Sequence, residues 1–350
     1  MSRELMRVIK QIEREKGISK DILFEMLKAA LVSAYKKNFG SSHNIEIDID
    51  PSDGEIRVLA LKKVVKDVRD PRLEISVEEA VELGESPIEG SIVKVEITPK
   101  DFGRIAAQTA KQVIVQRLKE VEREVIYEEF KGKVGDIVTG SVYRSDRSQV
   151  MINLGKTEAI LPIQEQIPTE EYEPGKTLKF YVLEVRKTTK GPKIVVSRTH
   201  PGLLKRLFEL EVPEVHDGVV EIKAVVREPG TRSKVAVYSN DPNVDPIGAC
   251  VGAKGARVQA ISRELSGERI DVVVWDPDPL IFIANALSPA KVIKIERIEG
   301  EERGARVWVP PEQLSLAIGR EGQNARLVAR LTGWRIDIKP YEGELDIGEG

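Results

Sequence analysis

The stretch Val251-Gly-Ala-Lys-Gly255 recurs 67 residues later as Ile318-Gly-Arg-Glu-Gly322. Downstream of each copy, Leu265-Ser-Gly-Glu-Arg-Ile-Asp271 and Leu331-Thr-Gly-Trp-Arg-Ile-Asp337 agree at five of seven positions, with an offset of 66. The alignment therefore slips by one residue within the helix expected between the two blocks. A repeat of this kind indicates that one supersecondary unit is used twice in the chain.

Each copy is preceded by the same order of predicted elements. Apolar periodicity predicts a helix followed by two strands; these segments are Pro201–Leu210, Val219–Val226 and Lys234–Tyr238 in the first copy, and Pro279–Leu287, Lys291–Ile298 and Ala305–Val309 in the second. The repeated unit is therefore predicted as helix, strand, strand, helix, Gly-x-x-Gly loop, helix, strand.

The Gly-x-x-Gly loop has two interpretations. Glycines remove side chains where a ligand backbone can approach, and a helix start presents N–H groups and partial positive charge that attract anions. A single such loop also suits a tight helix–helix turn for steric reasons alone. Its recurrence in the same frame, with Lys254 in one copy and Arg320 in the other, favours nucleic-acid binding. In KH domains such a loop clamps about four nucleotides.

Residues 131–198 change from helical to strand periodicity. Turn glycines separate five short apolar runs, Ile137–Val142, Val150–Leu154, Glu158–Leu161, Leu178–Val182 and Lys193–Ser197. Five short strands in so few residues predict a small closed barrel, and the pattern fits an SH3-like barrel equally well. The segment holds 12 Lys and Arg against 8 Asp and Glu, a charge of +4, which is the only basic excess in the chain.

The first 130 residues predict a mixed α/β head that ends in a long helix. Two helices separated by Gly17, the second capped by Ser19, precede a hairpin at 45–58, a short helix at 77–83 and a strand at 93–97. The stretch from Asp101 to Phe130 has no Gly or Pro after Gly103. Its second half is mostly polar, which suits both a solvated face and a spacer between two bodies.

Composition excludes several classes of protein. The single cysteine, Cys250, excludes a disulfide framework and fits a reducing, cytoplasmic compartment. No apolar run reaches the roughly 20 residues of a membrane span, and the charged N-terminus is not a signal peptide. The three histidines lie apart, and both Gly-Lys-Thr triplets lack the glycine that a phosphate-binding P-loop needs. We therefore expect no enzyme activity, no catalytic residue, no metal and no cofactor.

Four stretches of the sequence look like those of a known family: the loops Ile247–Ile261 and Ala317–Leu327, and the head segments Gly17–Lys20 and Ala30–Gly40. With the order head, long helix, barrel and two repeats, they resemble the NusA family of bacterial transcription factors. The resemblance covers about residues 1–340. It implies an α+β multidomain fold in which a five-stranded OB-type barrel of the ribosomal S-one kind precedes two tandem type II KH domains. The implied boundaries are 1–130 for the head and long helix, 131–198 for the barrel, 199–276 and 277–344 for the KH domains, and 345–350 for an acidic tail. Because the sequence ends at Gly350, the extra C-terminal repeats of some family members, and autoinhibition through them, are not expected.

The family's RNA contacts transfer to ten positions, namely Gly252, Ala253, Lys254, Gly255 and Arg257 in the first repeat, and Gly319, Arg320, Gly322, Gln323 and Asn324 in the second. Amides such as those of Gln323 and Asn324 both donate and accept hydrogen bonds, so they suit base edges; the alternative is helix capping. Glu321 opposes phosphate binding, so we expect the second loop to read bases more than it binds charge.

The barrel lacks the aromatic pair that often stacks bases on the second strand of such barrels, because Ser148–Met151 stands there. Tyr143, Arg144 and Tyr181 remain candidate RNA contacts. Half-buried structural tyrosines are equally expected, as is a barrel that guides RNA by charge or serves as a spacer.

The resemblance implies an RNA-binding elongation factor that modulates pausing, hairpin-dependent termination and antitermination. Its expected partners are single-stranded nascent RNA and the core of RNA polymerase near the RNA exit channel, with other Nus-type antitermination factors as further candidates. We expect a monomer with no membrane partner. The alternative from another class is an RNA-binding guide subunit of an RNA degradation or processing complex.

Overall fold

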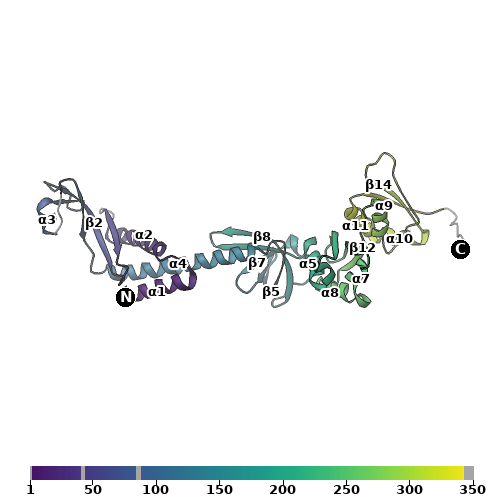
Figure 1. Ribbon diagram of the computed structural model, residues 1–350, viewed down its shortest axis with the longest axis horizontal. Coiled ribbons are helices and arrows are strands. Elements are labelled where there is room, and N and C mark those ends of the chain that lie inside the picture. Colours follow the sequence, from purple (N-terminus) through teal and green to yellow (C-terminus); the bar gives the residue numbers. More distant parts are fainter. Residues whose placement is uncertain (1, 41–43, 84–87, 343–350) are drawn as a thin grey trace. The chain divides into compact units, whose positions relative to one another are not determined.

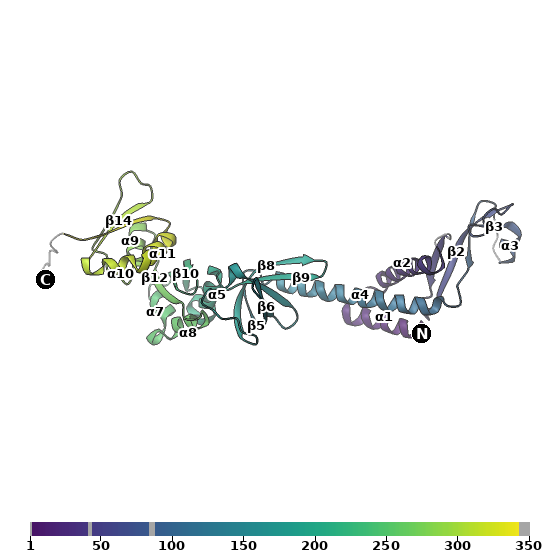
Figure 2. The same ribbon diagram turned by 180° about the vertical axis from the view of Figure 1, so that it is seen from behind.

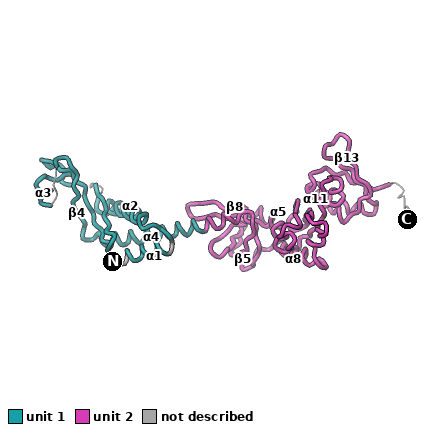
Figure 3. Tube along the Cα trace, viewed as in Figure 1, with its two compact units in different colours: residues 1–125 teal, residues 126–350 magenta. Residues whose placement is uncertain are grey.

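The computed structural model describes residues 2–40, 44–83 and 88–342 (Figure 1). The chain divides into two compact units, unit 1 at Met1–Val125 and unit 2 at Ile126–Gly350 (Figure 3). The expected acidic tail at 345–350 lies outside the described residues. Helix α4 (Phe102–Lys131) contributes to both units.

Unit 1 begins with two helices, α1 (Ser2–Lys16) and α2 (Lys20–Phe39). Gly17 adopts a φ of 66° between them, and the Ser19 side chain accepts a hydrogen bond from the Asp21 N–H, which confirms the predicted cap. The remaining elements before α4 are β1 (Ile45–Ile49), β2 (Ile56–Val65), β3 (Glu74–Ser76), α3 (Val77–Glu82) and β4 (Ile92–Glu96). Strand β2 pairs with the other three strands.

The core of unit 1 is formed where α1, α2 and the first half of α4 meet strands β1 and β2. Leu27, Ile47, Val58, Phe102 and Ala106 are all buried within one apolar cluster. The predicted packing of the first half of the long helix is therefore confirmed. A second, smaller cluster joins β2, β3, α3 and β4 through Val64, Ile75, Ala80 and Val93.

Unit 2 begins with a closed five-stranded barrel, as the strand periodicity predicts. Its strands are β5 (Ile137–Ser145), β6 (Gln149–Asn153), β7 (Glu158–Pro162), β8 (Thr177–Thr188) and β9 (Gly191–Ser197), with the short η1 (Ile163–Glu165) after β7. The order around the barrel is β5-β6-β7-β9-β8. Ile126 and Phe130 of α4 pack against its core.

Two α/β modules follow the barrel, and they share one topology (Figures 1 and 2). The first module comprises α5 (Pro201–Glu211), α6 (Pro213–His216), β10 (Val220–Glu228), β11 (Arg232–Ser239), α7 (Pro246–Val251), η2 (Ala253–Gly255), α8 (Ala256–Glu264) and β12 (Arg269–Val274). The second module comprises α9 (Pro279–Ala286), β13 (Lys294–Arg297), β14 (Gly304–Val309), η3 (Pro311–Gln313), α10 (Leu314–Ile318), η4 (Arg320–Gly322), α11 (Gln323–Thr332) and β15 (Arg335–Pro340). In each sheet the first two strands are antiparallel and the last two parallel. The predicted repeat is therefore confirmed.

The offset between the two repeats changes from 67 to 66 residues where helices α8 and α11 end. Helix α8 ends at Glu264, and both Ser266 and Gly267 adopt positive φ before β12 begins. Helix α11 continues to Thr332, and Gly333 alone adopts positive φ before β15. The first module thus uses a longer turn to reach the same strand.

The two modules share a core. Ala236 and Val273, from the sheet of the first module, belong to the same buried cluster as Ile283 and Val328, from helices α9 and α11 of the second. Both faces of strand β11 are therefore covered, which explains why residues 232–237 are all buried. The two modules are therefore joined by a continuous apolar core.

Candidate nucleic-acid interface

The two Gly-x-x-Gly segments fold into the same structure, here named loop 1 (Gly252–Gly255) and loop 2 (Gly319–Gly322). The leading glycines have φ/ψ of 72°/174° and 76°/168°, and the closing glycines have 80°/14° and 73°/14°. In each loop the closing glycine N–H donates to the leading glycine carbonyl, at 3.0 Å in loop 1 and 3.1 Å in loop 2. Each loop joins a short helix to the helix that follows it.

The leading glycines are required sterically. A Cβ on Gly252 would lie 2.8 Å from Cγ of Arg257, and a Cβ on Gly319 would lie 2.8 Å from the backbone nitrogen of Asn324. The surroundings of Gly322 are open, because a Cβ at that position would meet nothing within 4 Å among the described residues beyond its chain neighbours. Loop 2 therefore combines a tight turn at its leading glycine with open space at its closing glycine, which is the arrangement that an approaching ligand backbone needs. In loop 1 a Cβ on Gly255 would lie 3.3 Å from Nε2 of Gln259, the end of a flexible side chain.

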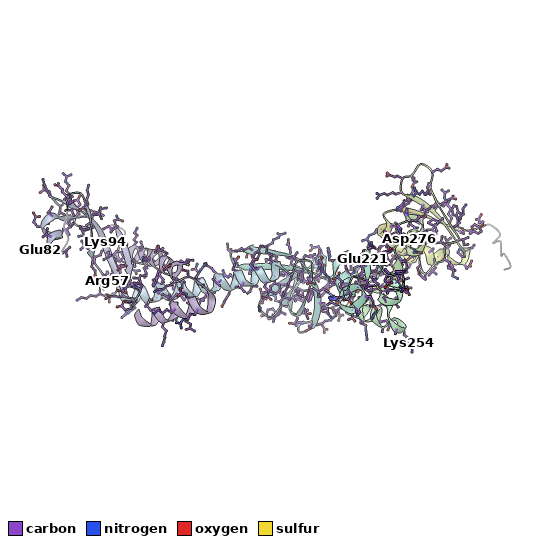
Figure 4. All side chains as sticks on the ribbon, viewed as in Figure 1. Arg57, Glu82, Lys94, Glu221, Lys254 and Asp276 are labelled. Carbon is purple, nitrogen blue, oxygen red and sulfur yellow. The ribbon has the colours of Figure 1, made fainter. Side chains whose placement is uncertain are left out.

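The residues between the glycines are exposed. Ala253 and Lys254 lie on the surface, and Figure 4 shows Lys254 at the outer edge of the first module. The side chains of Arg320 and Glu321 are 92% and 83% exposed. Within the described part of the chain, neither loop tip is covered by another element, so each is accessible to a ligand.

The two loops carry their charges at different positions. Lys254 and Glu321 occupy the same place in the loop, with left-handed φ values of 51° and 52°. Arg320 instead corresponds to Ala253. Loop 1 thus has a cation at this left-handed position, whereas loop 2 has a carboxylate there and a cation one residue earlier.

Arg257 supports loop 1 from beneath. Its Nη1 donates to the Ala249 carbonyl at 2.6 Å and to the Glu214 carboxylate at 2.9 Å, and its methylenes line Gly252. The side chain is half-buried, with 32% of its area exposed. Its guanidinium is therefore committed in part to the module itself.

Asn324 is the equivalent residue beneath loop 2, and the structure contradicts its expected place at the RNA surface. The residue is 0% exposed, and its Nδ2 donates to the carbonyls of Ala317 at 3.0 Å and Leu287 at 3.3 Å. Its Oδ1 has no hydrogen-bond partner among the described residues. It is also not a helix cap, because Gly322 holds that position. The sequence pattern did not reveal this because Gln and Asn next to a loop look alike whether they point outward or inward.

Gln323 turns toward the first module rather than away from the protein. Its Nε2 donates to Glu228 at 2.8 Å and to the Thr231 hydroxyl at 3.2 Å. The neighbouring Arg326 donates to the same Glu228 carboxylate at 2.6 Å. The expected base-reading role of Gln323 therefore competes with a contact between the modules.

The candidate barrel contacts lie in different environments. Tyr143 is 62% exposed, and Arg144 beside it is 69% exposed and lies 3.7 Å from Asp146, next to an irregularity in β5. Tyr181 is half-buried and stacks on His200, with ring centroids 4.4 Å apart. Its environment supports the structural alternative, because it packs against the core of the first module.

An ionic joint between barrel and first module was not foreseen from the sequence. Arg198 is 0% exposed and binds Glu170 at 2.5 Å and Glu264 at 3.1 Å, and it also donates to the Glu264 and Lys179 carbonyls. Although burial opposes it, the Arg198 guanidinium holds the pKa of Glu170 below its usual range. Isolated charges in two loops and at the end of helix α8 give no periodic signal, so only the fold reveals this joint.

Other chemistry is not evident in the described part of the chain. Residues 2–40, 44–83 and 88–342 contain no group of three or more His, Cys, Asp or Glu side chains arranged to hold a metal ion. Cys250 is buried, and burial raises the pKa of its thiol to about 12. None of the described helices has the length and apolar character to cross a membrane.

Comparison with known families matches all four parts of the chain. The families described as the NusA N-terminal domain, the S1 RNA binding domain, the NusA-like first KH domain and the NusA-like second KH domain match residues 4–124, 131–197, 198–275 and 279–344. The transcription termination/antitermination protein NusA of Bacillus subtilis is 56% identical over 348 residues, covering 99% of this chain and 94% of that protein. The chain belongs to the NusA family.

A more distant relative agrees with this assignment. NusA of Thermus thermophilus is 45% identical over 353 residues, covering 98% of this chain and 91% of that protein. The solution structure of the N-terminal domain of NusA from Bacillus subtilis is 54% identical and covers 35% of this chain and 99% of that one, with a TM-score of 0.32. The S1 match decides the barrel in favour of the OB type over the SH3-like type. The S1 and KH domains indicate that the chain binds RNA.

Proposed function

We propose that loop 1 and loop 2 are the two points at which one single-stranded RNA meets this protein. The observation that carries the proposal is the closely matching backbone geometry of two exposed loops, each closed by a glycine that meets at most the end of a flexible side chain. The contacts are the backbone of Gly252, Gly255, Gly319 and Gly322, with Ala253, Lys254 and Arg320 beside the strand. Arg257 and Gln323 act from the edge of this surface. Tyr143 and Arg144 are candidate contacts on the barrel.

The charges of the chain support RNA binding at the two loops rather than binding to any polyanion. The chain has a net charge of −3, so it lacks the basic excess of a protein that binds any polyanion. Loop 1 offers the Lys254 ammonium to a phosphate, whereas loop 2 places Glu321 at the same position. Phosphate contacts position a strand and base contacts specify it, so loop 1 contributes more of the salt-dependent affinity.

We further propose that residues 1–130 bind the core of RNA polymerase near the RNA exit channel, while residues 131–198, 199–276 and 277–344 hold the emerging transcript. A single chain of this kind bridges enzyme and product, which suits modulation of pausing, hairpin-dependent termination and antitermination. It acts as a monomer in the cytoplasm without a catalytic step, and other Nus-type antitermination factors are candidate partners.

The double variant Gly252→Asp with Gly319→Asp tests the loops. A side chain at each leading glycine forces the tight turn to shift, and its carboxylate repels phosphate, so affinity for single-stranded RNA should fall by at least tenfold, while polymerase binding persists. Gly218→Asp is the matched control, because Gly218 also has positive φ, with open space around it, but lies outside both loops. Unchanged RNA affinity in a folded double variant would refute the assignment.

A further inference from the structure

We propose that Glu228 is a positioning residue that fixes loop 2 relative to loop 1, so that RNA held at both loops must have a defined number of nucleotides between them. The inference rests on the proposed function of the two loops. It adds to that function a spacing rule and assigns the rule to a residue that contacts no RNA.

Glu228 is the last residue of strand β10, and it bonds the first residue of helix α11, 95 residues later in the chain. Its Oε1 accepts a hydrogen bond from Nε of Arg326 at 2.6 Å, and its Oε2 accepts one from Nε2 of Gln323 at 2.8 Å. Gln323 follows directly after Gly322, the closing glycine of loop 2. Both carboxylate oxygens thus hold the helix that begins at loop 2.

The turn that carries Glu228 is itself held on the opposite side. The Gly230 N–H donates to Glu268 at 2.9 Å, and Glu268 pairs with Arg227 at 2.7 Å. Arg227 in turn donates to the carbonyls of Arg198 and His200, at 3.1 Å and 3.0 Å.

Close packing adds to these polar contacts. A Cβ on Gly230 would lie 2.7 Å from Cγ2 of Ile167 and would also overlap the Thr169 hydroxyl, so the turn lies directly against the barrel. The turn at 228–231 is therefore the place where barrel, first module and loop 2 meet. It gives Glu228 a fixed position from which to hold α11.

Polar contacts of two other residues also cross between the modules, but not at helix α11: Lys234 donates to the Ser288 carbonyl at 3.0 Å, and Asn285 donates to the Val274 carbonyl at 3.2 Å. Much of the remaining contact is apolar. Val226, Ala236 and Val328 pack together there, and apolar contacts are non-directional and set no register by themselves. A partly shielded carboxylate with two donors in fixed directions does set one; 20% of the Glu228 side chain is exposed. Glu228 bonds helix α11 through both carboxylate oxygens, so it holds the helix that begins at loop 2 in place along the first module.

The repeat supports this assignment. Strand pairing places Ile298 of the second module where Glu228 stands in the first, because Lys234 and Arg306 both face the aspartate of the last strand. In the first module, Ala256 and Gln259 stand where Gln323 and Arg326 stand in the second. The acceptor Glu228 and the donors Gln323 and Arg326 therefore occur only in the two copies that face each other where the modules meet.

The test uses two pentauridylates joined by polyethylene glycol spacers of increasing length, with a single pentauridylate as reference. Linked sites bind best when the spacer matches their separation. The wild-type protein should show a sharp affinity maximum at one spacer length, at least tenfold above the single pentamer. Glu228→Ala should lower that maximum about fivefold and broaden it, while affinity for the single pentamer stays within about twofold.

Three further variants make the test specific. Glu221→Ala removes another ion-paired carboxylate of β10, whose partners Lys223 and Asn240 lie in the first module and not in helix α11, and it should keep the wild-type profile. Glu228→Gln retains an acceptor and should restore part of the maximum. Glu228→Arg combined with Arg326→Glu reverses the pair and should restore most of it, which a merely destabilising change would not allow.

The outcomes separate the two proposals. If Gly252→Asp with Gly319→Asp abolishes binding but Glu228→Ala keeps the wild-type spacer profile, the role of Glu228 is overturned and the loops stand. If the glycine variants leave RNA affinity unchanged, both proposals fail. Unfolding midpoints show whether Glu228→Ala folds, and Arg326→Ala replaces it if it does not.

Discussion

Lys254 and Glu321 share one backbone conformation and carry opposite charges, so they show what a single side chain contributes to each loop. Both lie on the surface, where an added or removed cation changes mainly the number of neutralised phosphates. We expect Lys254→Ala to reduce the slope of log affinity against log salt concentration by about one, and Glu321→Lys to increase it by about one. Fluorescence anisotropy with labelled RNA at several salt concentrations measures both.

The matched control for these changes is Lys205→Ala, an exposed cation of α5 in the same module that is not part of either loop. It should leave the salt slope unchanged. An equal change of slope in the control would show that general charge, rather than the loops, determines the affinity.

Asn324 affects loop 2 only by stabilising the structure beneath it. Asn324→Ala removes two hydrogen bonds and leaves the carbonyls of Leu287 and Ala317 without this donor, so the free energy of unfolding should fall by about 1–3 kcal/mol. RNA affinity of the folded variant should be nearly unchanged. Urea denaturation and RNA titration at low temperature test the two effects separately.

Asn243→Ala, at an exposed site of the first module, provides the comparison and should leave stability unchanged. A large loss of RNA affinity in Asn324→Ala without any loss of stability would return Asn324 to the RNA surface.

At the scale of elements, the joint between barrel and first module depends on the buried pair of Arg198 and Glu170. Removing one partner leaves an uncompensated buried charge, so Glu170→Ala should lower the free energy of unfolding of unit 2 by about 3–5 kcal/mol. Chemical denaturation of the full chain, followed by a probe in unit 2, measures this. Glu171→Ala, at the exposed neighbouring residue, should have little effect.

The same pair predicts how stability depends on pH. Against the opposing effect of burial, the hydrogen bonds and charge of Arg198 lower the pKa of Glu170 in the folded protein. The unfolded chain then binds more protons than the folded one near the ordinary glutamate pKa of about 4.3, so this contribution is complete above that pH and is lost as the pH falls. Glu170→Gln should therefore lose less stability than the wild type as the pH falls from about 5 to about 3. Equal losses in both proteins would contradict this assignment.

At the scale of the whole molecule, the cores of the two units meet helix α4 at different residues. Leu118 and Val121 pack against the unit 1 core, whereas Ile126 and Phe130 pack against the barrel core. Each fragment cut between Val125 and Ile126 keeps its own core and should fold alone, so residues 126–350 should retain RNA affinity within about twofold. Residues 1–125 should recover RNA polymerase, but not RNA, in pull-down experiments.

The partner recovered by residues 1–125 also distinguishes the two functional hypotheses. Recovery of nuclease subunits in place of polymerase would favour a guide subunit of an RNA degradation or processing complex. Loss of RNA affinity in a folded 126–350 fragment would show that unit 1 contributes to the RNA site.

The sequence by itself determined the elements, their order and the repeat. Periodicity, the Ser19 cap and the turn glycines are local signals, and local backbone and solvation preferences decide them. The same local signals located loop 1 and loop 2, because a leading glycine with positive φ is required by the turn itself.

Only the tertiary structure decided which way the side chains beside the loops face. Asn324 lies inside the second module, Gln323 bonds Glu228, and Arg198 joins two domains, although all three look like surface residues in the sequence. Their environments depend on contacts between segments as much as 95 residues apart, and no periodic pattern records such contacts. Burial and hydrogen bonding with distant partners, rather than residue type, therefore separate the side chains that are free to meet RNA from those that hold the loops in place.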